Sequence, residues 1–422
     1  MKWGRFMKLN KEEKSWALYD WANSAYSMTV TTTILPLYFK MLTDSALIDK
    51  STSTAYWGYA NSIATFIVAL LAPILGTIAD YKGYKKKFFI SFFLIGIIST
   101  ALLSVPNSSA WPLLLFVYIL TVIGFSGSNI FYDAFLVDVT SEERMDRVST
   151  MGYALGYIGS TIPFIVCMII VILAQFNKIP ISVYTASKIS FIITAIWWGI
   201  FTIPMIKNVK QKYYIEPEKN PVTSSFKRIY KTFKNIKQHK SLFIFLIAYF
   251  FYIDGVDTII KMSTSYGSDL GISATSLLII LLLTQFVAFP FAILYGRLSE
   301  KYSTKTMLYV AIIIYTIICI YAYFLKTALD FWILAMLVGT SQGGIQALSR
   351  SYFGKLVPKE NSNEFFGFYN IFGKFAAIMG PFLVGLVAQL TGETKNGVFS
   401  VIILFIIGGI LLRKSTNLKN NQ

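Results

Sequence analysis

The stretch GTIADYKGYKKK, from Gly76 to Lys87, lies between two long apolar runs of the chain. Its aspartate and lysines would be costly in hydrocarbon, so it predicts a short polar loop between two membrane-spanning helices. A related stretch, GRLSEKYSTK from Gly296 to Lys305, lies about 220 residues later between two further apolar runs. In both stretches a glycine is followed four residues later by an acid, Asp80 or Glu300. The repeat predicts a protein made of two related halves.

The composition excludes an ordinary soluble domain. Hydrophobic residues make up 55% of the chain and charged residues 14%, with a mean hydropathy of +0.58. The net charge of +17 is concentrated in loops between apolar runs, which favours a membrane protein over a nucleic-acid partner. The two cysteines, Cys167 and Cys319, lie in apolar runs without metal-ligand spacing, so we expect neither a metal nor a disulfide.

The apolar runs predict an all-α polytopic membrane protein with twelve spans in two six-helix halves. The N-terminal half comprises residues 1–206, a basic linker residues 207–240, and the C-terminal half residues 241–422. The expected spans are residues 16–40, 56–79, 88–106, 112–138, 149–175, 188–206, 241–264, 274–297, 305–325, 331–353, 365–390 and 397–412.

The positive charges predict that both termini are cytoplasmic. With the N-terminus inside, 30 of the 38 Lys and Arg residues fall on the inner face, 7 fall on the outer face, and Lys374 lies within a span. An excess of Lys and Arg on one face marks the cytoplasmic side. The linker carries ten of these residues. Its stretch SSFKRIYKTFKNIKQHK predicts an amphipathic helix on anionic headgroups, with a solvated loop as the alternative.

Ionisable residues within spans are candidate functional groups, because they are expensive in lipid and tend to face a wet interior. The third, sixth, ninth and twelfth expected spans carry none, so we expect these four on the outside and the others around a central path. The ionisable residues within the remaining spans are Asp20, Asp133, Asp254, Asp257, Lys261, Arg350 and Lys374.

Asp254 and Asp257 predict a proton site near the middle of the seventh span. Three residues apart, they are expected on one face of the helix, and two carboxylates so close do not both ionise easily. One of them could therefore carry H⁺, with Na⁺ as the alternative ion; both could instead be paired with Lys261 or with hydrogen-bond donors. Asp20 and Asn23 repeat the three-residue spacing in the first span, where Asp20 could also reach water at the helix end.

In the tenth span, Gln342, Gln346 and Arg350 follow at intervals of four residues and share one helix face. Arg350 could pair with a substrate carboxylate, or with Asp133 as an inner gate. Lys374 joins this set as a candidate residue of the substrate or proton path.

The repeated loops predict a latch at the inner face. Asp80 and Glu300 could each accept hydrogen bonds from the first amides of a helix in the other half, and release them when the halves move. Gly76 and Gly83 would then serve close packing and the turn. Gly296 is the counterpart of Gly76.

The first loop resembles the G-x-x-x-D-x-x-G-x-[KR]-[KR] signature of the major facilitator superfamily. It matches the signature at Gly76, Asp80, Gly83, Lys85 and Lys86. The resemblance implies the superfamily fold and places Lys85 and Lys86 with the inner gate.

Longer runs resemble the vacuolar amino-acid effluxer-like branch of that superfamily, whose eukaryotic members are linked to autophagy. They are WALYDWANSAYS (Trp16 to Ser27), YIDGVDTI (Tyr252 to Ile259), GGIQALSRSYFGKLVP (Gly343 to Pro358), and EFFGFYNIFGK with MGPF (Glu364 to Phe382). The resemblance implies secondary transport of amino acids or related metabolites without nucleotide hydrolysis. The short loops lack the insertions common in fungal members, so we expect a prokaryotic inner membrane.

These observations predict a secondary active transporter of small polar metabolites that works by alternating access and is coupled to protons. No nucleotide-binding glycine loop and no metal-spaced His or Cys set is present in the sequence, so we expect neither an enzyme nor a cofactor. Two alternatives stay open: a flippase or scramblase for lipid or lipid-linked cargo, which would have an apolar cavity wall open to the bilayer, and a membrane sensor that moves no cargo.

Overall fold

The computed structural model describes residues 8–107, 110–216, 221–234, 239–269 and 271–417, and these are helical apart from loops and one isolated bridge between Tyr81 and Ile215. The helices before the linker are α2 (Lys11–Ala25), η1 (Tyr26–Ile34), α3 (Leu35–Ser45), α4 (Lys50–Ala79), α5 (Tyr84–Leu102), α6 (Trp111–Ala134), α7 (Leu136–Val139), η3 (Glu142–Arg144), α8 (Met145–Gln175) and α9 (Val183–Asn208). From the linker onward they are α10 (Pro221–Lys234), α11 (Lys240–Asp269), α12 (Ala274–Tyr302), α13 (Thr304–Tyr323), α14 (Ala328–Leu356), η5 (Lys359–Asn361), α15 (Ser362–Thr391), α16 (Thr394–Ser400) and α17 (Ile402–Asn417).

Ten helices among the described residues are long and apolar enough to cross a membrane. They contain α4, α6, α8, α9, α11, α12, α13, α14, α15 and α17. Two expected spans are not among them. Residues 16–40 are divided by the π-helix η1, and α5, which covers most of residues 88–106, has three lysines in its first turn. The twelve crossings and the cytoplasmic termini therefore stay predictions.

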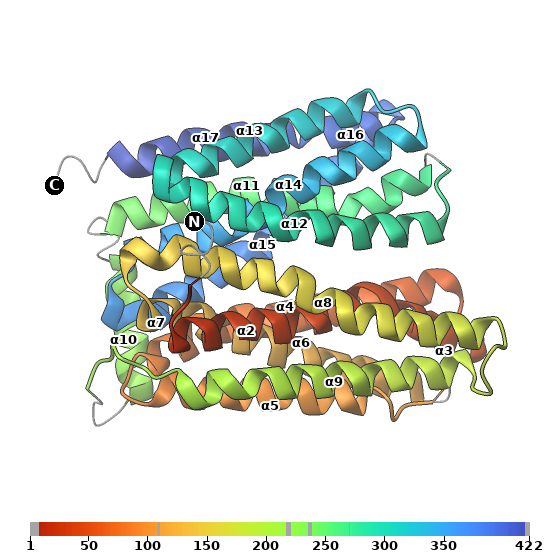
Figure 1. Ribbon diagram of the computed structural model, residues 1–422, viewed down its shortest axis with the longest axis horizontal. Coiled ribbons are helices and arrows are strands. Elements are labelled where there is room, and N and C mark those ends of the chain that lie inside the picture. The colour runs from red at the N-terminus through yellow and green to blue at the C-terminus, as the bar shows by residue number, and fades with distance from the viewer. Residues whose placement is uncertain (1–7, 108–109, 217–220, 235–238, 270, 418–422) are drawn as a thin grey trace.

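The helices form two groups that lie side by side. Figure 1 shows α2, α5, α8 and α9 in one group and α12, α13 and α17 in the other, with α5 and α9 along one outer edge and α13 and α17 along the opposite edge. These four correspond to the expected spans without ionisable residues, and they expose apolar side chains such as Ile200 and Ile313. The division of the chain into an N-terminal half ending at residue 206, a linker, and a C-terminal half starting after residue 240 stays a prediction. The end of the molecule that carries α10 is called the linker end below.

The two groups touch mainly where α4 packs on α15 and where α8 packs on α12 and α14. The first contact depends on Gly76, because a Cβ atom built there would lie 2.4 Å from the backbone oxygen of Asn363. Gly83 has a φ of +79° and forms the N-cap of α5, which is a backbone conformation that glycine adopts without strain. The two loop glycines therefore set the approach of the halves and the turn into α5.

Replacing Gly76 by valine should weaken the contact between α4 and α15. The added carbons have no room against the backbone of α15, and overpacking of this kind costs ~1–3 kcal/mol. We expect the melting temperature of the purified protein to fall by several degrees. Gly58→Val on the same helix is the matched control, because nothing lies within 4 Å of a Cβ at that position. An equal melting temperature for both variants would contradict the close approach.

Candidate functional site

A cavity of about 430 Å³ lies between the two groups of helices. Its walls come from α2, η1, α6 and α8 on one side and from α11, α12, α14 and α15 on the other. Its lining is rich in polar and charged side chains: Asp20, Asn23, Ser24, Ser27, Thr32, Asn129, Asp133, Asp257, Gln285, Gln346, Arg350, Asn370 and Lys374. The sequence-predicted Asp20, Asn23, Asp133, Asp257, Gln346, Arg350 and Lys374 thus converge on one space.

Arg350 joins the two groups of helices at the linker-end side of this cavity. Its Nη2 donates to Asp20 Oδ2 at 3.1 Å and its Nη1 donates to Asp133 Oδ1 at 3.2 Å. Its Nε donates to the hydroxyl of Ser149 at 3.0 Å, so all three nitrogens have partners. The guanidinium carbon also lies 4.5 Å from the centre of the Tyr153 ring. This set of partners satisfies a cation that is almost fully buried.

The sequence offered two partners for Arg350, a substrate carboxylate or Asp133. The structure pairs Arg350 with Asp133 and also with Asp20. Asp20 also accepts a 2.7 Å hydrogen bond from the Tyr132 hydroxyl. It therefore belongs to an ion-pair network rather than facing water at a helix end. Sequence reasoning missed Tyr132 and Ser149, because a tyrosine and a serine in an apolar run give no signal until a charge is placed beside them.

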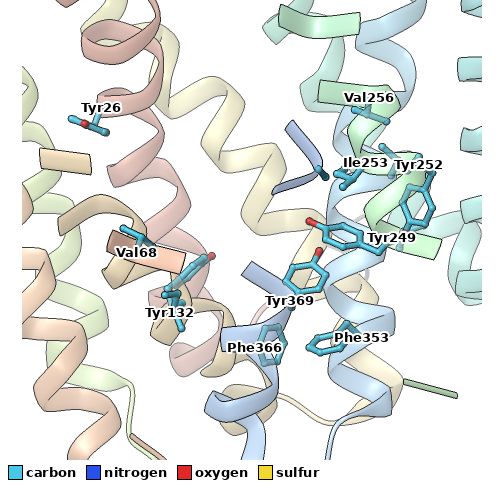
Figure 2. Packing of buried hydrophobic residues seen from close by; sticks show 14 of the residues in the cluster. Tyr26, Val68, Tyr132, Tyr249, Tyr252, Ile253, Val256, Phe353, Phe366 and Tyr369 are labelled. Atoms are coloured by element: carbon cyan, nitrogen blue, oxygen red, sulfur yellow. The ribbon is translucent and has the colours of Figure 1, made fainter. Parts of the chain in front are cut away.

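Aromatic rings line the cavity next to this network. Tyr249 of α11 stacks on Tyr369 of α15 with ring centres 4.3 Å apart, and Phe353 lies 4.9 Å from Tyr369 on its other side. Figure 2 shows the hydroxyls of Tyr132 and Tyr249 directed toward the space between the two groups, with the Tyr369 hydroxyl directed toward Tyr249. The aromatic block is therefore rigid, with polar tips on the cavity side.

Asp254 and Asp257 face different surroundings. Asp257 lines the cavity and interacts electrostatically with Lys261, as the sequence alternative expected, and also with Lys374. The Nζ of Lys374 donates to Ser126 at 2.8 Å. Asp254 is fully buried against α15, where its Oδ1 accepts from the amide of Gly380 at 2.9 Å. Three residues turn a helix by roughly 300°, which leaves the two side chains about 60° apart. Because of this angle, Asp257 faces the cavity and Asp254 packs against Gly380.

The two glutamines of α14 also diverge. Gln346 lines the central cavity, where its Oε1 accepts from the Tyr157 hydroxyl at 3.3 Å. Gln342 does not line the central cavity; it lines a second, largely apolar pocket, which Gln346 borders as well. Asn23 donates to Asn129 Oδ1 at 2.7 Å, which ties α2 to α6. Asn129 is a further cavity residue that the sequence alone did not reveal.

The first span is irregular beside the cavity. The nine residues of η1 form a π-helix in which Thr31 and Thr32 donate their hydroxyls to the carbonyl of Ser27, each at 2.8 Å. Ser27 and Thr32 both line the cavity. Short π-helical stretches are rare and occur frequently at functional sites. The hydroxyl-rich sequence YSMTVTTTI favours the π-helix, because its threonine hydroxyls donate hydrogen bonds to backbone carbonyls.

Asp80 binds the first turn of α15 at the linker end. Its Oδ1 accepts from the backbone amide and from the side-chain amide of Asn363, both at 2.9 Å. This is the contact expected of an acid that holds the start of a helix in the other half, and its role as a latch stays a proposal. Glu300 behaves differently, because it pairs with the Arg147 side chain at 2.7 Å rather than with helix amides.

The linker contributes a residue to the same contact. Arg228 of α10 donates to Asp80 Oδ2 at 2.9 Å and to Glu364 Oε2 at 3.3 Å, so it bridges an acid of α4 and an acid of α15. Burial raises the pKa of the Asp80 carboxyl to about 7, although Arg228, Asn363 and Lys85 oppose this shift. The Asp80 carboxyl therefore changes its protonation state near neutral pH.

The other loop residues are structural in this conformation. Lys85 is fully buried and forms a 2.6 Å ion pair with Asp138, while Lys86 donates to the carbonyl of Val209 at 3.0 Å. Gly296 is buried in α12, and its carbonyl accepts from Ser299 at 2.8 Å.

The fold and the cavity define a membrane transporter of the major facilitator type. A family model described as "Vacuole effluxer Atg22 like" matches residues 46–421. The "Uncharacterized MFS-type transporter YxiO" of Bacillus subtilis is 63% identical over 96% of this chain and 95% of its own length. "Autophagy-related protein 22" of Saccharomyces cerevisiae is 25% identical over 83% of this chain and 75% of its own length.

Solved structures show the same fold. The Escherichia coli fucose:proton symporter FucP has a TM-score of 0.72 at 14% identity and covers 96% of this chain and 97% of its own. The human organic anion transporter MFSD10 has a TM-score of 0.69 at 12% identity and covers 95% of this chain and 99% of its own. The chain belongs to the Atg22-like family of major facilitator transporters, and it is a multi-pass integral membrane protein, not an enzyme.

Replacing Arg350 by methionine should destabilise the observed conformation strongly. Asp20 and Asp133 would lose their shared cation in a buried site, and breaking a buried pair in this way costs ~3–5 kcal/mol. Thermal unfolding in detergent measures the loss. Arg147→Met removes the more exposed pair with Glu300 and is the matched control, expected to cost ~0–1 kcal/mol. Equal losses would show that the Arg350 network does not hold the halves.

Asp80 should give the protein a pH-dependent stability. Its folded-state pKa of about 7 lies above the ordinary 3.8, so its protonated form stabilises the fold fully below about pH 4, and this contribution is lost as pH rises through 7. Asp80→Asn should therefore gain melting temperature relative to the wild type between pH 5 and pH 8. The half-exposed Glu300→Gln variant is the control and should show no such trend. A constant difference between wild type and Asp80→Asn would contradict the assignment.

Proposed function

We propose that this protein is a secondary active transporter that moves small polar metabolites, such as amino acids or related compounds, by alternating access coupled to protons. The observation that carries the proposal is the central cavity, which both groups of helices line with charged and amide side chains. A flippase for lipid cargo would call for an apolar wall open to the bilayer instead. The family description as a vacuole effluxer supports efflux as the activity.

The distribution of contacts supports a conformation closed at the linker end. Arg350 with Asp20, Arg147 with Glu300, and Asp80 with Asn363 all join the two groups there. With the positive-inside rule, the linker end faces the cytoplasm, so the cavity is shut toward the cytoplasm in this structure. Transport then requires these contacts to break together as the halves rock.

Arg228 of the linker helix α10 takes part in closing the linker end, because it binds both Asp80 and Glu364. The exposed face of α10 carries Phe226 and Tyr230, of which 52% and 70% are accessible, with Lys227 and Lys231 beside them. Such a face fits the headgroup region of an anionic leaflet. Binding of α10 to lipid would hold Arg228 between Asp80 and Glu364. The relationship to the Bacillus subtilis protein supports a prokaryotic cell membrane as the location.

Asp254 is the best candidate for the proton site. Its Oδ2 is buried and accepts no hydrogen bond from the part of the chain that the structure describes, whereas Oδ1 is held by Gly380. A carboxylate with one unpartnered oxygen in a dry interior is costly to keep charged, so H⁺ or a small cation is needed there. XylE and FucP, which share the fold, are proton:xylose and fucose:proton symporters. Asp257 and Lys374 would bind the charged groups of the substrate.

Replacing Asp254 by asparagine should separate coupling from binding. In liposomes with an imposed pH gradient and a mixture of amino acids, detected by mass spectrometry, we expect exchange to persist and proton-driven accumulation to disappear. Asp257→Asn should instead reduce both by tenfold or more, because it changes the cavity itself. Glu393→Gln, an exposed acid, is the control. Unchanged accumulation and pH dependence in Asp254→Asn would remove the carrier role of this residue.

A further inference from the structure

A second cavity lies inside the C-terminal group of helices. It measures about 170 Å³, and its walls come from α11, α12, α13, α14, α15 and the end of α16, with Tyr157 of α8 at its border. Most of its lining is aliphatic or aromatic and buried, including Ile280, Phe331, Leu334, Val338 and Val398. Protein interiors contain few voids larger than a water molecule. An apolar cavity of roughly 150 Å³ stays dry and accepts a benzene-sized molecule.

The second cavity adjoins the central one. Five residues line both: Tyr157, Ile260, Leu281, Gln285 and Gln346. Two of these are amides and one is a phenol, so the shared border between the ionic chamber and the apolar chamber is partly polar.

The charged groups of the central cavity lie close to this shared border. Asp257 precedes Ile260 by three residues on α11, and Arg350 follows Gln346 by four residues on α14. Each separation is about one helical turn, or ~5 Å along the axis. One small molecule could therefore place a charged head beside Asp257 and Lys374 and an apolar group in the second cavity.

We propose that the second cavity is the subsite for the uncharged group of the transported molecule, so that the substrate is amphipathic, with a charged head and an aliphatic or aromatic group of about benzene size. The inference rests on the proposed transport function. The border that the second cavity shares with the central one selects the substrate as the occupant over a bilayer lipid, because the lining side chains are mostly buried. A purely polar metabolite would leave the apolar chamber empty.

The test measures binding of straight-chain probes by thermal shift to the full-length protein. Three series are used, namely 2-amino acids, carboxylates and alkylamines, each from two to eight carbons. In at least one series, affinity should rise about fourfold for each added CH₂ until the chamber is full. Val338→Phe, which fills the chamber, should abolish this rise while the shortest probe binds within twofold of wild type. Leu334→Ala should move the optimum to longer chains.

Ile333→Phe is the matched control, because Ile333 lies on the same helix with 44% of its side chain exposed and lines neither cavity. It should leave the slope unchanged. No slope in any series, or a slope that survives Val338→Phe, overturns the inference. A phospholipid retained by the wild type but lost from Val338→Phe, without any slope, assigns the chamber to a lipid chain and also overturns it. A chain-length slope without flux in liposomes would support the subsite while rejecting the transport function.

Discussion

Arg350 carries a permanent charge into the interior of a membrane protein, and much of the structure serves to make that tolerable. Its three nitrogens find Asp20, Asp133 and Ser149, which lie on α2, α6 and α8 of the other group of helices. A lone guanidinium in such a place would be too costly, so the two groups must meet wherever Arg350 is buried. The same contact also closes one side of the central cavity.

That requirement explains why the interactions between the groups gather at one end. Asp80 with Asn363 and Arg147 with Glu300 lie at the same end as Arg350, and Arg228 from the linker adds a bridge to Glu364. Each is a polar contact that water can replace when it opens. Ionic groups in a seam of this kind suit a protein that alternates between two arrangements, because packed apolar surfaces are harder to separate and rejoin.

The two cavities divide the chemistry of recognition between them. The central one offers acids, amides and Lys374, and these suit the charged part of a ligand. The second one offers aliphatic and aromatic walls. Asp254 belongs to neither lining, since it is packed against Gly380 of α15. An ion taken up there would act on the helix contact rather than on the substrate directly.

Much of this protein follows from its sequence alone. The apolar runs, the polar loop at Gly76 and the basic linker predict a polytopic helical transporter, and a charge in an apolar run marks its own position because lipid tolerates it poorly. Helix periodicity, however, places Asp254 and Asp257 only within about 60° of each other, and the neighbouring helices decide that one faces the cavity and the other faces Gly380. The partners of Arg350, the bridge from Arg228 and the apolar chamber depend on segments far apart in the chain. Only the tertiary structure determines these, because they arise from distances between helices that no local pattern encodes.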